Sequence, residues 1–361
     1  MGKGCAGNMV KKTKMKFLLT IPLLLSIAFA QIGIPKDYPF GPLHGVTTED
    51  LQIKADGKTD DLAALKAWAK TGGILPAMPY SLVRITNTCA IPKEVSANLY
   101  IPDGKLIKDS SQYAKSTPAV TLDLNFCTIW LDNPDKTKAV FAYNAWGRIN
   151  NNTGLPYDNN SGCIKNGTLR GVGIGISTAY TGFLRIENIN FQNFKTGLVL
   201  NNASNLTGTN LKFSNCERAE FDIRSHSSSF RNIVVEYCKK GFEIRSNNMI
   251  IEGYSAINCN IGLHVAAGNN KISGVVLETT REGEAQLLIG DSTGAKVDGN
   301  VFEAITISAP NLRAIKWLKT AGMMSINGGG AQSTLFEVVG QPTVWVMNFL
   351  GTLPSTITKK L

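Results

Sequence analysis

The stretch from Asn166 to Gly283 repeats with a period of about 22 residues, and this repeat constrains the fold more than any other feature of the chain. The leading position of the repeat is occupied in turn by Asn166, Asn188, Asn210, Asn232, Gly253 and Gly274. The first spacings are identical, and the last two are shorter by a single residue. Asparagine and glycine are the residues that best tolerate a left-handed backbone. A sharp turn is therefore expected once in every repeat.

Each repeat also contains short apolar segments that alternate with polar residues, as in Ile189 to Phe191 and Leu198 to Leu200. Such brief period-two alternation is typical of a strand and is too short for a helix. A third apolar piece, such as Met249 to Ile251, precedes the next turn residue. The pattern predicts an all-β, single-stranded parallel β-helix with three short strands in each coil.

Residues 1–30 have the form of a cleaved secretory signal peptide. Five lysines and no acidic residue precede an apolar run from Phe17 to Phe29, and Ala28 and Ala30 are small residues at the positions that a signal peptidase reads. The run falls short of the ~20 residues that a membrane-spanning helix needs. We therefore expect secretion, to the periplasm or the extracellular space, and no stable membrane span after cleavage.

Loss of this segment would lower the net charge from +10 to +5, because it holds five of the 37 basic residues and none of the 27 acidic ones. A mild positive balance suits an anionic polysaccharide. The mature chain has no basic run and no cluster of arginine with aromatic residues, which argues against nucleic acid as a partner.

We expect an N-terminal extension at 31–52, one β-helix domain at 53–350 and a C-terminal tail at 351–361.

Three of the six remaining cysteines fall at one repeat position. Cys216, Cys238 and Cys259 follow Phe194 at intervals of one repeat each, so they should form an inward column of buried thiols in successive coils. A bridge between Cys216 and Cys238 is the alternative. Without a C-x-x-C pair or a nearby histidine, no zinc site is expected.

The segment from Ile53 to Leu65 is followed by a Gly72-to-Pro76 run and by Tyr80. This combination resembles the N-terminal segment of the pectate-lyase superfamily, which includes secreted polysaccharide lyases, glycosidases and phage tailspikes. The resemblance implies a right-handed, pectin-lyase-like β-helix and says little about the reaction. The sequence departs from the family pattern after Pro76, where Ala77-Met-Pro replaces the expected Pro-Gly.

A helix is expected at 59–70 within this segment. Thr59 or Asp60 would begin it, and the apolar residues Leu62, Leu65 and Trp68 would cover the open end of the first coil.

A charged column is expected on the outer surface of the second strand of each coil. Asp222, Glu243 and His264 occupy one outward, solvent-facing position in the repeat, about 4.8 Å apart from coil to coil. A second column and its flank add the positive charges of Arg224, Arg245, Arg218 and Lys240. In the family that the chain resembles, the substrate groove commonly follows this strand face, which implies a site here. The alternative is a solvated ladder of paired charges.

Two mechanisms suit this column. In hydrolysis, one of Asp222 and Glu243 would be the general acid and the other the nucleophile or base. In β-elimination, the two carboxylates would hold a calcium ion and Arg245 or Lys240 would take the α-proton. The catalytic candidates are therefore Asp222, Glu243, His264 and Arg245. No cofactor is expected unless a lyase needs calcium.

A long polar loop between Ala139 and Ser161 contains Trp146 and Tyr157. These two side chains either stack on sugar rings or anchor the loop to the coil. The candidates for binding a sugar chain are therefore Arg218, Arg224, Lys240, Trp146 and Tyr157.

These observations favour a secreted protein that cleaves or binds an acidic polysaccharide. A polysaccharide lyase or glycoside hydrolase is placed before the alternative, a non-catalytic adhesin or tailspike-like glycan binder. The sequence does not identify the sugar, and it leaves both a monomer and a trimer open.

Overall fold

The computed structural model describes residues 52–91, 121–144 and 162–359, apart from short gaps at 180, 202, 224, 292–296, 310–312, 319–320, 323, 332–335, 340–343 and 351–357. The chain divides into two units, Met1–Gly45 and Val46–Leu361, and every described residue belongs to the second. The expected signal peptide lies outside the described residues, as do Trp146 and Tyr157.

The described strands form two sheets. Sheet A contains β1 (Asp56–Asp60), β2 (Gly73–Ile74), β3 (Leu82–Ile85), β5 (Thr121–Asp123), β6 (Thr128–Leu131), β8 (Cys163–Gly171), β10 (Arg185–Gln192), β12 (Thr207–Ser214), β14 (Ser229–Glu236), β16 (Ile250–Ile257), β18 (Lys271–Glu278), β20 (Asn300–Ser308), β22 (Met324–Ala331), β24 (Val344–Leu350) and β25 (Thr358–Lys359). Sheet B contains β4 (Cys89–Ile91), β7 (Ala139–Asn144), β9 (Ile174–Ala179), β11 (Thr196–Asn201), β13 (Arg218–Ile223), β15 (Lys240–Ile244), β17 (Ile261–Val265), β19 (Leu287–Ile289), β21 (Ile315–Trp317) and β23 (Phe336–Val338).

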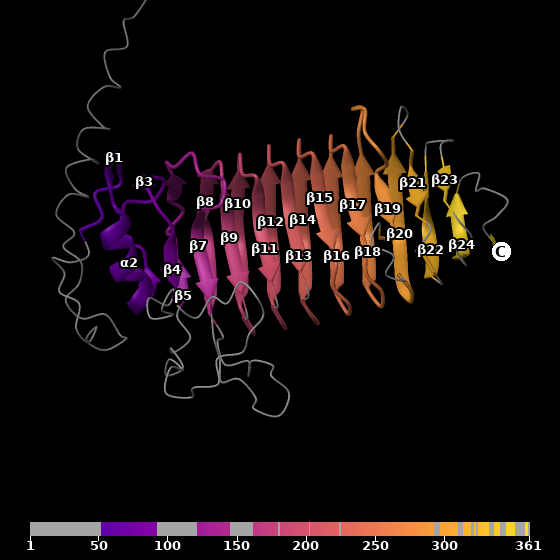
Figure 1. Ribbon diagram of the computed structural model, residues 1–361, viewed down its shortest axis with the longest axis horizontal. Coiled ribbons are helices and arrows are strands. Elements are labelled where there is room, and N and C mark those ends of the chain that lie inside the picture. The colour runs from indigo at the N-terminus through magenta and orange to yellow at the C-terminus, as the bar shows by residue number, and fades with distance from the viewer. Residues whose placement is uncertain are drawn as a thin grey trace, which may run out of the picture. The chain divides into compact units, whose positions relative to one another are not determined.

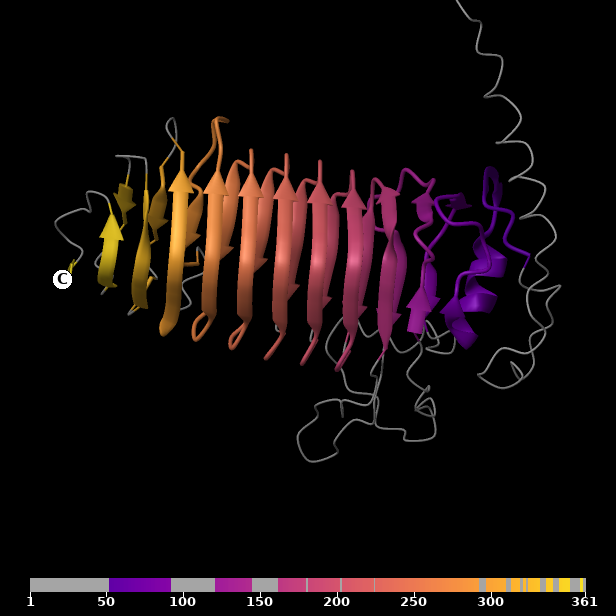
Figure 2. The ribbon, with the colours of Figure 1, turned by 180° about the vertical axis from the view of Figure 1, so that it is seen from behind.

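The chain winds into stacked coils, and from β8 to β24 the strands alternate between sheet A and sheet B (Figure 1). Strands of successive coils pair in parallel, as β10 does with β12 and β11 with β13. Seen from behind, the strands again lie side by side along the stack, so both faces are sheets (Figure 2). One continuous apolar core fills the space between them. The predicted fold is confirmed: the domain is a single-stranded, right-handed parallel β-helix.

The prediction of three strands in each coil is wrong, because the turn residue bends a strand without ending it. Asn188 has a φ of 55° and lies inside β10. Pairing with β12 continues on both sides of Asn188: Glu187 pairs with Thr209, and Asn190 pairs with Lys212. The two short apolar pieces on either side of each asparagine therefore belong to one long strand of sheet A.

The left-handed asparagines support one another through their side chains. The amide of Asn188 donates to Asn166 at 2.9 Å, Asn210 donates to Asn188 at 2.9 Å, and Asn232 donates to Asn210 at 3.1 Å. Asn166 in turn donates to the carboxylate of Asp123 at 3.2 Å. A ladder of amides thus runs along the outer surface of sheet A across four coils.

The cysteine column faces inward as predicted. Cys216, Cys238 and Cys259 are buried free thiols, and each sulfur lies 3.5 to 3.6 Å from the carbonyl oxygen two residues before it. The same geometry recurs in each coil because the backbone of each coil repeats that of the last.

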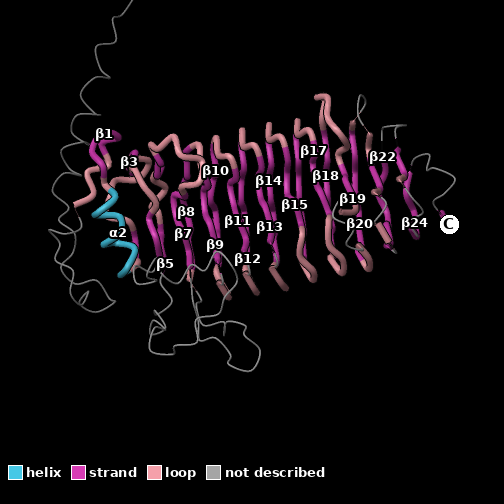
Figure 3. The backbone as a smooth tube through the Cα atoms, in the orientation of Figure 1, coloured by secondary structure: helices cyan, strands magenta, loops and turns pink. Residues whose placement is uncertain are grey.

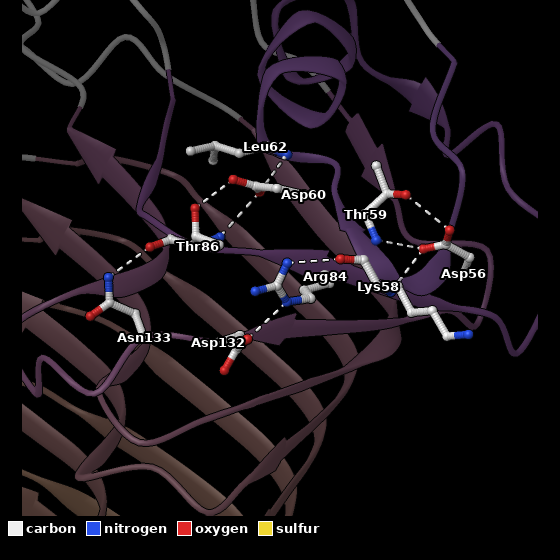
Figure 4. A network of polar contacts seen from close by, with 9 residues as sticks. All are labelled: Asp56, Lys58, Thr59, Asp60, Leu62, Arg84, Thr86, Asp132 and Asn133. Atoms are coloured by element: carbon white, nitrogen blue, oxygen red, sulfur yellow. Dashed lines mark hydrogen bonds and ion pairs between the residues drawn. The ribbon is translucent and has the colours of Figure 1, made fainter.

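The described part of the chain has one helix, α2 (Leu62–Thr71), which lies at the N-terminal end of the stack (Figure 3). Leu65 and Trp68 are buried against the core, and Leu62 is partly buried. The Asp60 carboxylate accepts hydrogen bonds from the backbone N–H groups of Leu62 and Thr86, each at 3.2 Å, and so ties the start of the helix to the loop after β3 (Figure 4). No helix among the described residues is long and apolar enough to cross a membrane.

The asparagine ladder makes a prediction about stability. Asn210→Ala should lower the free energy of unfolding by about 1–3 kcal/mol, because alanine resists the left-handed backbone and removes two amide hydrogen bonds. Asn210→Gly loses the same hydrogen bonds but accepts the backbone, so it should melt at a higher temperature than Asn210→Ala. Thermal unfolding followed by circular dichroism measures both. Equal melting temperatures for the two variants would show that the backbone conformation at this position has little influence.

Candidate functional site

One outward-facing column of sheet B brings Glu243 and His264 together. Glu243 of β15 pairs with His264 of β17, and the column continues to Leu288 of β19. In the other direction Glu243 pairs with Phe221 of β13. The predicted adjacency of Glu243 and His264 is confirmed, but Asp222 does not belong to their column.

Asp222 faces the interior of the coil. It pairs with Leu200, a core residue, and is itself fully buried. The step from Phe221 to Glu243 is longer by a single residue than the step from β14 to β16. The shortening of the repeat therefore follows Glu243 instead of preceding it. A shift of one residue moves a side chain to the opposite face of a strand, which is why the predicted position of Asp222 is wrong.

Glu243 lies among three cationic side chains. Its Oε1 atom accepts a hydrogen bond from Nε of Arg245 at 2.8 Å, and Nη2 of Arg245 is also 2.8 Å away. Its Oε2 atom lies 3.1 Å from Nε of Arg218 and 3.8 Å from Nζ of Lys240. Only 2% of the Glu243 side chain is exposed. The prediction that this carboxylate faces solvent is therefore wrong, since its partners fold over it.

The cations determine the ionisation of Glu243. Burial would raise its pKa, but the charges of Arg218 and Lys240 and the hydrogen bond from Arg245 outweigh that effect, so the pKa lies below its ordinary value. Glu243 is thus ionised at neutral pH. This setting suits an anchor for cations and does not suit a general acid.

His264 has one ring nitrogen occupied and one free. Nε2 lies 2.9 Å from the carbonyl oxygen of Gly290 and must carry the proton, because a carbonyl oxygen only accepts. Nδ1 lies 3.9 Å from Oε1 of Glu243 and has no hydrogen-bond partner among the described residues. Burial lowers the pKa of His264, against the opposing effects of Gly290 and Glu243. The neutral ring therefore has a lone pair at Nδ1 that accepts no hydrogen bond from the described residues, on an atom that is itself buried.

Phe221 contacts both arginines, Arg218 on its own strand and Arg245 from the next coil. The guanidinium carbon of Arg218 lies 4.2 Å from the centre of the Phe221 ring, and that of Arg245 lies 5.6 Å from it. Cation–π contact restricts the two guanidinium groups while parts of both side chains stay in solvent. The arrangement holds donors ready for an anion beside Glu243.

The outer face of sheet A has a different balance of charge. Three of its cations form one-to-one pairs, Lys212 with Glu236 at 2.8 Å, Arg231 with Glu252 at 2.8 Å and Lys271 with Glu303 at 3.5 Å. On sheet B, three cations share the single carboxylate of Glu243. The cluster formed by Arg218, Lys240, Glu243, Arg245 and His264, here called the cationic site, carries a local excess of about two positive charges.

The two carboxylates proposed to hold calcium do not fit that ion. Asp222 and Glu243 lie on opposite faces of sheet B, and the Glu243 oxygens already have cationic neighbours. Calcium takes six to eight oxygen ligands. Among the described residues, no group of three or more histidine, cysteine, aspartate or glutamate side chains could hold a metal ion. The same separation by the sheet argues against paired-acid hydrolysis by these two residues.

Two further results concern individual candidates. Arg224, like Trp146 and Tyr157, lies outside the described residues. Glu220 was not singled out from the sequence, yet it is fully buried in the interior beside this site. It stands one repeat after Leu198 and one repeat before Phe242, and the apolar character of both was the available signal.

Comparison with known proteins supports the fold alone. No family model matches the sequence, and no curated protein matches it. Among solved structures, the surface protein and adhesin PfbA of Streptococcus pneumoniae superposes with a TM-score of 0.51 at 12% identity, covering 86% of this chain and 95% of that one. The A-module of the mannuronan C-5 epimerase AlgE6 of Azotobacter vinelandii gives 0.49 at 13% identity, covering 85% and 99%.

Replacement of Glu243 tests the cluster. Glu243→Gln should reduce the free energy of unfolding by about 1–3 kcal/mol at neutral pH, because three cations lose their shared anion. Since the pKa of Glu243 is lowered by folding, its contribution exists above its ordinary value of 4.5 and disappears as the pH falls through the folded value. The difference in melting temperature from the wild type should therefore shrink in acid.

Glu252→Gln is the matched control, since Glu252 forms an exposed one-to-one pair with Arg231. It should change the free energy of unfolding by no more than about 0.5 kcal/mol. If Glu243→Gln is as mild as this control at neutral pH, the carboxylate does not hold the cluster together.

Proposed function

We propose that the cationic site binds an anionic polysaccharide along the outer face of sheet B. The observation that carries this proposal is the sharing of one carboxylate by Arg218, Lys240 and Arg245, in contrast to one-to-one pairs on sheet A such as Arg231 with Glu252. A carboxylate or sulfate group of a sugar chain would satisfy the remaining charge. Guanidinium groups suit this task because they bind such anions through two parallel hydrogen bonds.

Export through the expected signal peptide would place this surface outside the cytoplasm, where polysaccharides are met as polymers. The parallel stacking gives the face a regular spacing of about 4.8 Å, so a chain lying along the stack meets equivalent positions in successive coils. The likeness in fold to PfbA and AlgE6 does not select a sugar or an activity for this chain.

A second candidate is β-elimination at a uronate residue bound at the same place. It is favoured by the unpartnered Nδ1 of His264, a buried atom that a substrate would reach only after the side chains covering it move. Nδ1 would take the proton from the carbon next to the sugar carboxylate, the electron pair would form a carbon–carbon double bond, and the glycosidic oxygen would leave and be protonated by water. Arg218 and Arg245 would stabilise the charge that develops on the carboxylate. Arg245 already donates to Glu243, so His264 is better placed than Arg245 to act as the base.

Binding is tested with polygalacturonate as the probe. Lys240→Ala should weaken binding about fivefold and Arg218→Ala about tenfold or more, because each removes a cation from the site. Arg231→Ala on sheet A is the control and should leave the dissociation constant within about twofold. Affinity should fall between about 0.05 M and 0.3 M salt, as screening requires. Calorimetry gives the constants, and each variant's melting temperature is recorded beside them.

Equal binding of polygalacturonate and neutral dextran would contradict the proposal. β-Elimination is measured separately by ultraviolet absorbance, since its product has a carbon–carbon double bond conjugated with the sugar carboxylate. His264→Gln should abolish that absorbance while polygalacturonate still binds. Binding without absorbance or new reducing ends would leave a glycan binder as the function.

A further inference from the structure

Glu220 is a carboxylic acid at a position where the neighbouring coils have apolar side chains. On β13 it pairs with Leu198 of β11 and with Phe242 of β15, both of which are buried in the core. Glu220 has no exposed surface. Neither of its carboxyl oxygens meets a hydrogen-bond partner among the described residues. An ionisable group thus replaces one member of a hydrophobic column.

The surroundings of Glu220 offer it little solvation. Phe242 makes edge contacts with the rings of Phe213, Phe230 and Tyr254, at 5.3 to 5.6 Å between ring centres. The Tyr254 hydroxyl is already engaged, because it donates to the Gly262 carbonyl at 2.6 Å and accepts from the Phe242 N–H at 3.1 Å. An ionised carboxylate is strongly disfavoured in such a packed aromatic interior, so burial favours the protonated form of Glu220.

Most of the charged groups near Glu220 raise its pKa, as burial does. Burial raises its pKa well above the ordinary value, and the charges of Asp222 on the same strand and Glu243 on β15 raise it further. The Glu243 backbone N–H, which is near the carboxyl group but outside ordinary hydrogen-bond geometry, and the charge of Arg218 oppose this rise without reversing it. The remaining titratable neighbour is Tyr254 on β16, whose own pKa is raised by burial.

The sign of the pH effect follows from these shifts. Glu220 holds its proton more tightly in the folded state, so its contribution to stability is complete below pH 4.5 and is lost as the pH rises through the folded value. Asp222 acts in the same direction, starting from 3.8, because burial raises its pKa too. Glu243 acts in the opposite direction. A comparison of variants with the wild type is therefore needed to isolate Glu220.

We propose that Glu220 is an internal acid whose loss of a proton loosens the pairing of β13 with β15, so that the cationic site is held best in mildly acidic solution. β13, which carries Glu220, also carries Arg218, and its neighbour β15 carries Glu243, both on the outer side of the sheet. A carboxylate that moves toward water must displace these strands and with them the site. The effect on ligand binding rests on the proposed function, whereas the effect on stability does not.

The test compares the wild type with Glu220→Leu and Glu220→Gln by thermal unfolding between about pH 4.5 and pH 8.5. Leucine continues the column of Leu198, and glutamine keeps the size of the side chain while removing its ionisation. The melting temperature of the wild type should fall relative to both variants as the pH rises. Near pH 8.5, Glu220→Leu should exceed the wild type by ~4 °C or more. A pH-independent difference for both variants overturns the proposal.

Glu252→Gln on the surface of sheet A is the matched control, and its difference from the wild type should not follow the pattern of the Glu220 variants. Hydrogen exchange locates the change: protection of the β13 and β15 amides should drop at high pH in the wild type and persist in Glu220→Leu. Unchanged protection in the wild type would overturn the local loosening even if the melting temperature moved.

Binding of polygalacturonate completes the experiment. The wild type should lose affinity between pH 5 and pH 8 by about tenfold, while Glu220→Leu should keep most of its affinity. Equal loss of affinity in both proteins would overturn the link between Glu220 and the site. If the stability and exchange results are as expected but polygalacturonate binds at no pH, the proposed function fails while the internal acid stands.

Discussion

Parallel hydrogen bonding between successive coils is the interaction on which the rest of the structure depends. Because it fixes each residue opposite its equivalent in the next coil, single positions become columns: amides from Asn188 to Asn232 outside, and thiols from Cys216 to Cys259 inside. The left-handed residue in each long strand is tolerated because the pairing continues on both sides of it. The amide ladder offsets part of the cost of this conformation in the coils from Asn166 to Asn232.

The columns of equivalent residues also show where the sequence departs from the repeated apolar pattern of the interior. Glu220 and Asp222 stand inside β13, in columns that otherwise hold Leu198 and Leu200. Asp222 receives a hydrogen bond from the backbone of Ser225 at 3.2 Å, whereas Glu220 receives none within ordinary limits. Conflict between a local residue and its global setting is expected at functional places more often than elsewhere. Both exceptions belong to the strand that supplies Arg218 and Phe221 to the cationic site, which makes a common purpose the simplest explanation.

The stacking of the coils could be predicted from the sequence, whereas the geometry of the cationic site could not. The spacing of Asn188, Asn210 and Asn232 predicted the stacking, and the cysteine spacing predicted an inward column, because both depend only on the period. Locating the shortened repeat required knowing whether the missing residue precedes or follows Glu243, and alternation with period two cannot decide this from so short a strand. The burial of Glu243 was also beyond the sequence, since it comes from three long side chains that cover it in space.

The charges around Glu243 explain why this face, and not sheet A, is suited to an anion. Three cations held within 3.8 Å of one carboxylate would repel one another in its absence, so Glu243 serves to assemble them. It cannot neutralise them all, and the excess stays in a partly dry setting where an added anion interacts more strongly than in water. On sheet A, a cation such as Arg231 already has its own acid, so an anion bound to it would have to displace that partner. The excess of positive charge around Glu243 therefore distinguishes this part of sheet B from the paired charges of sheet A.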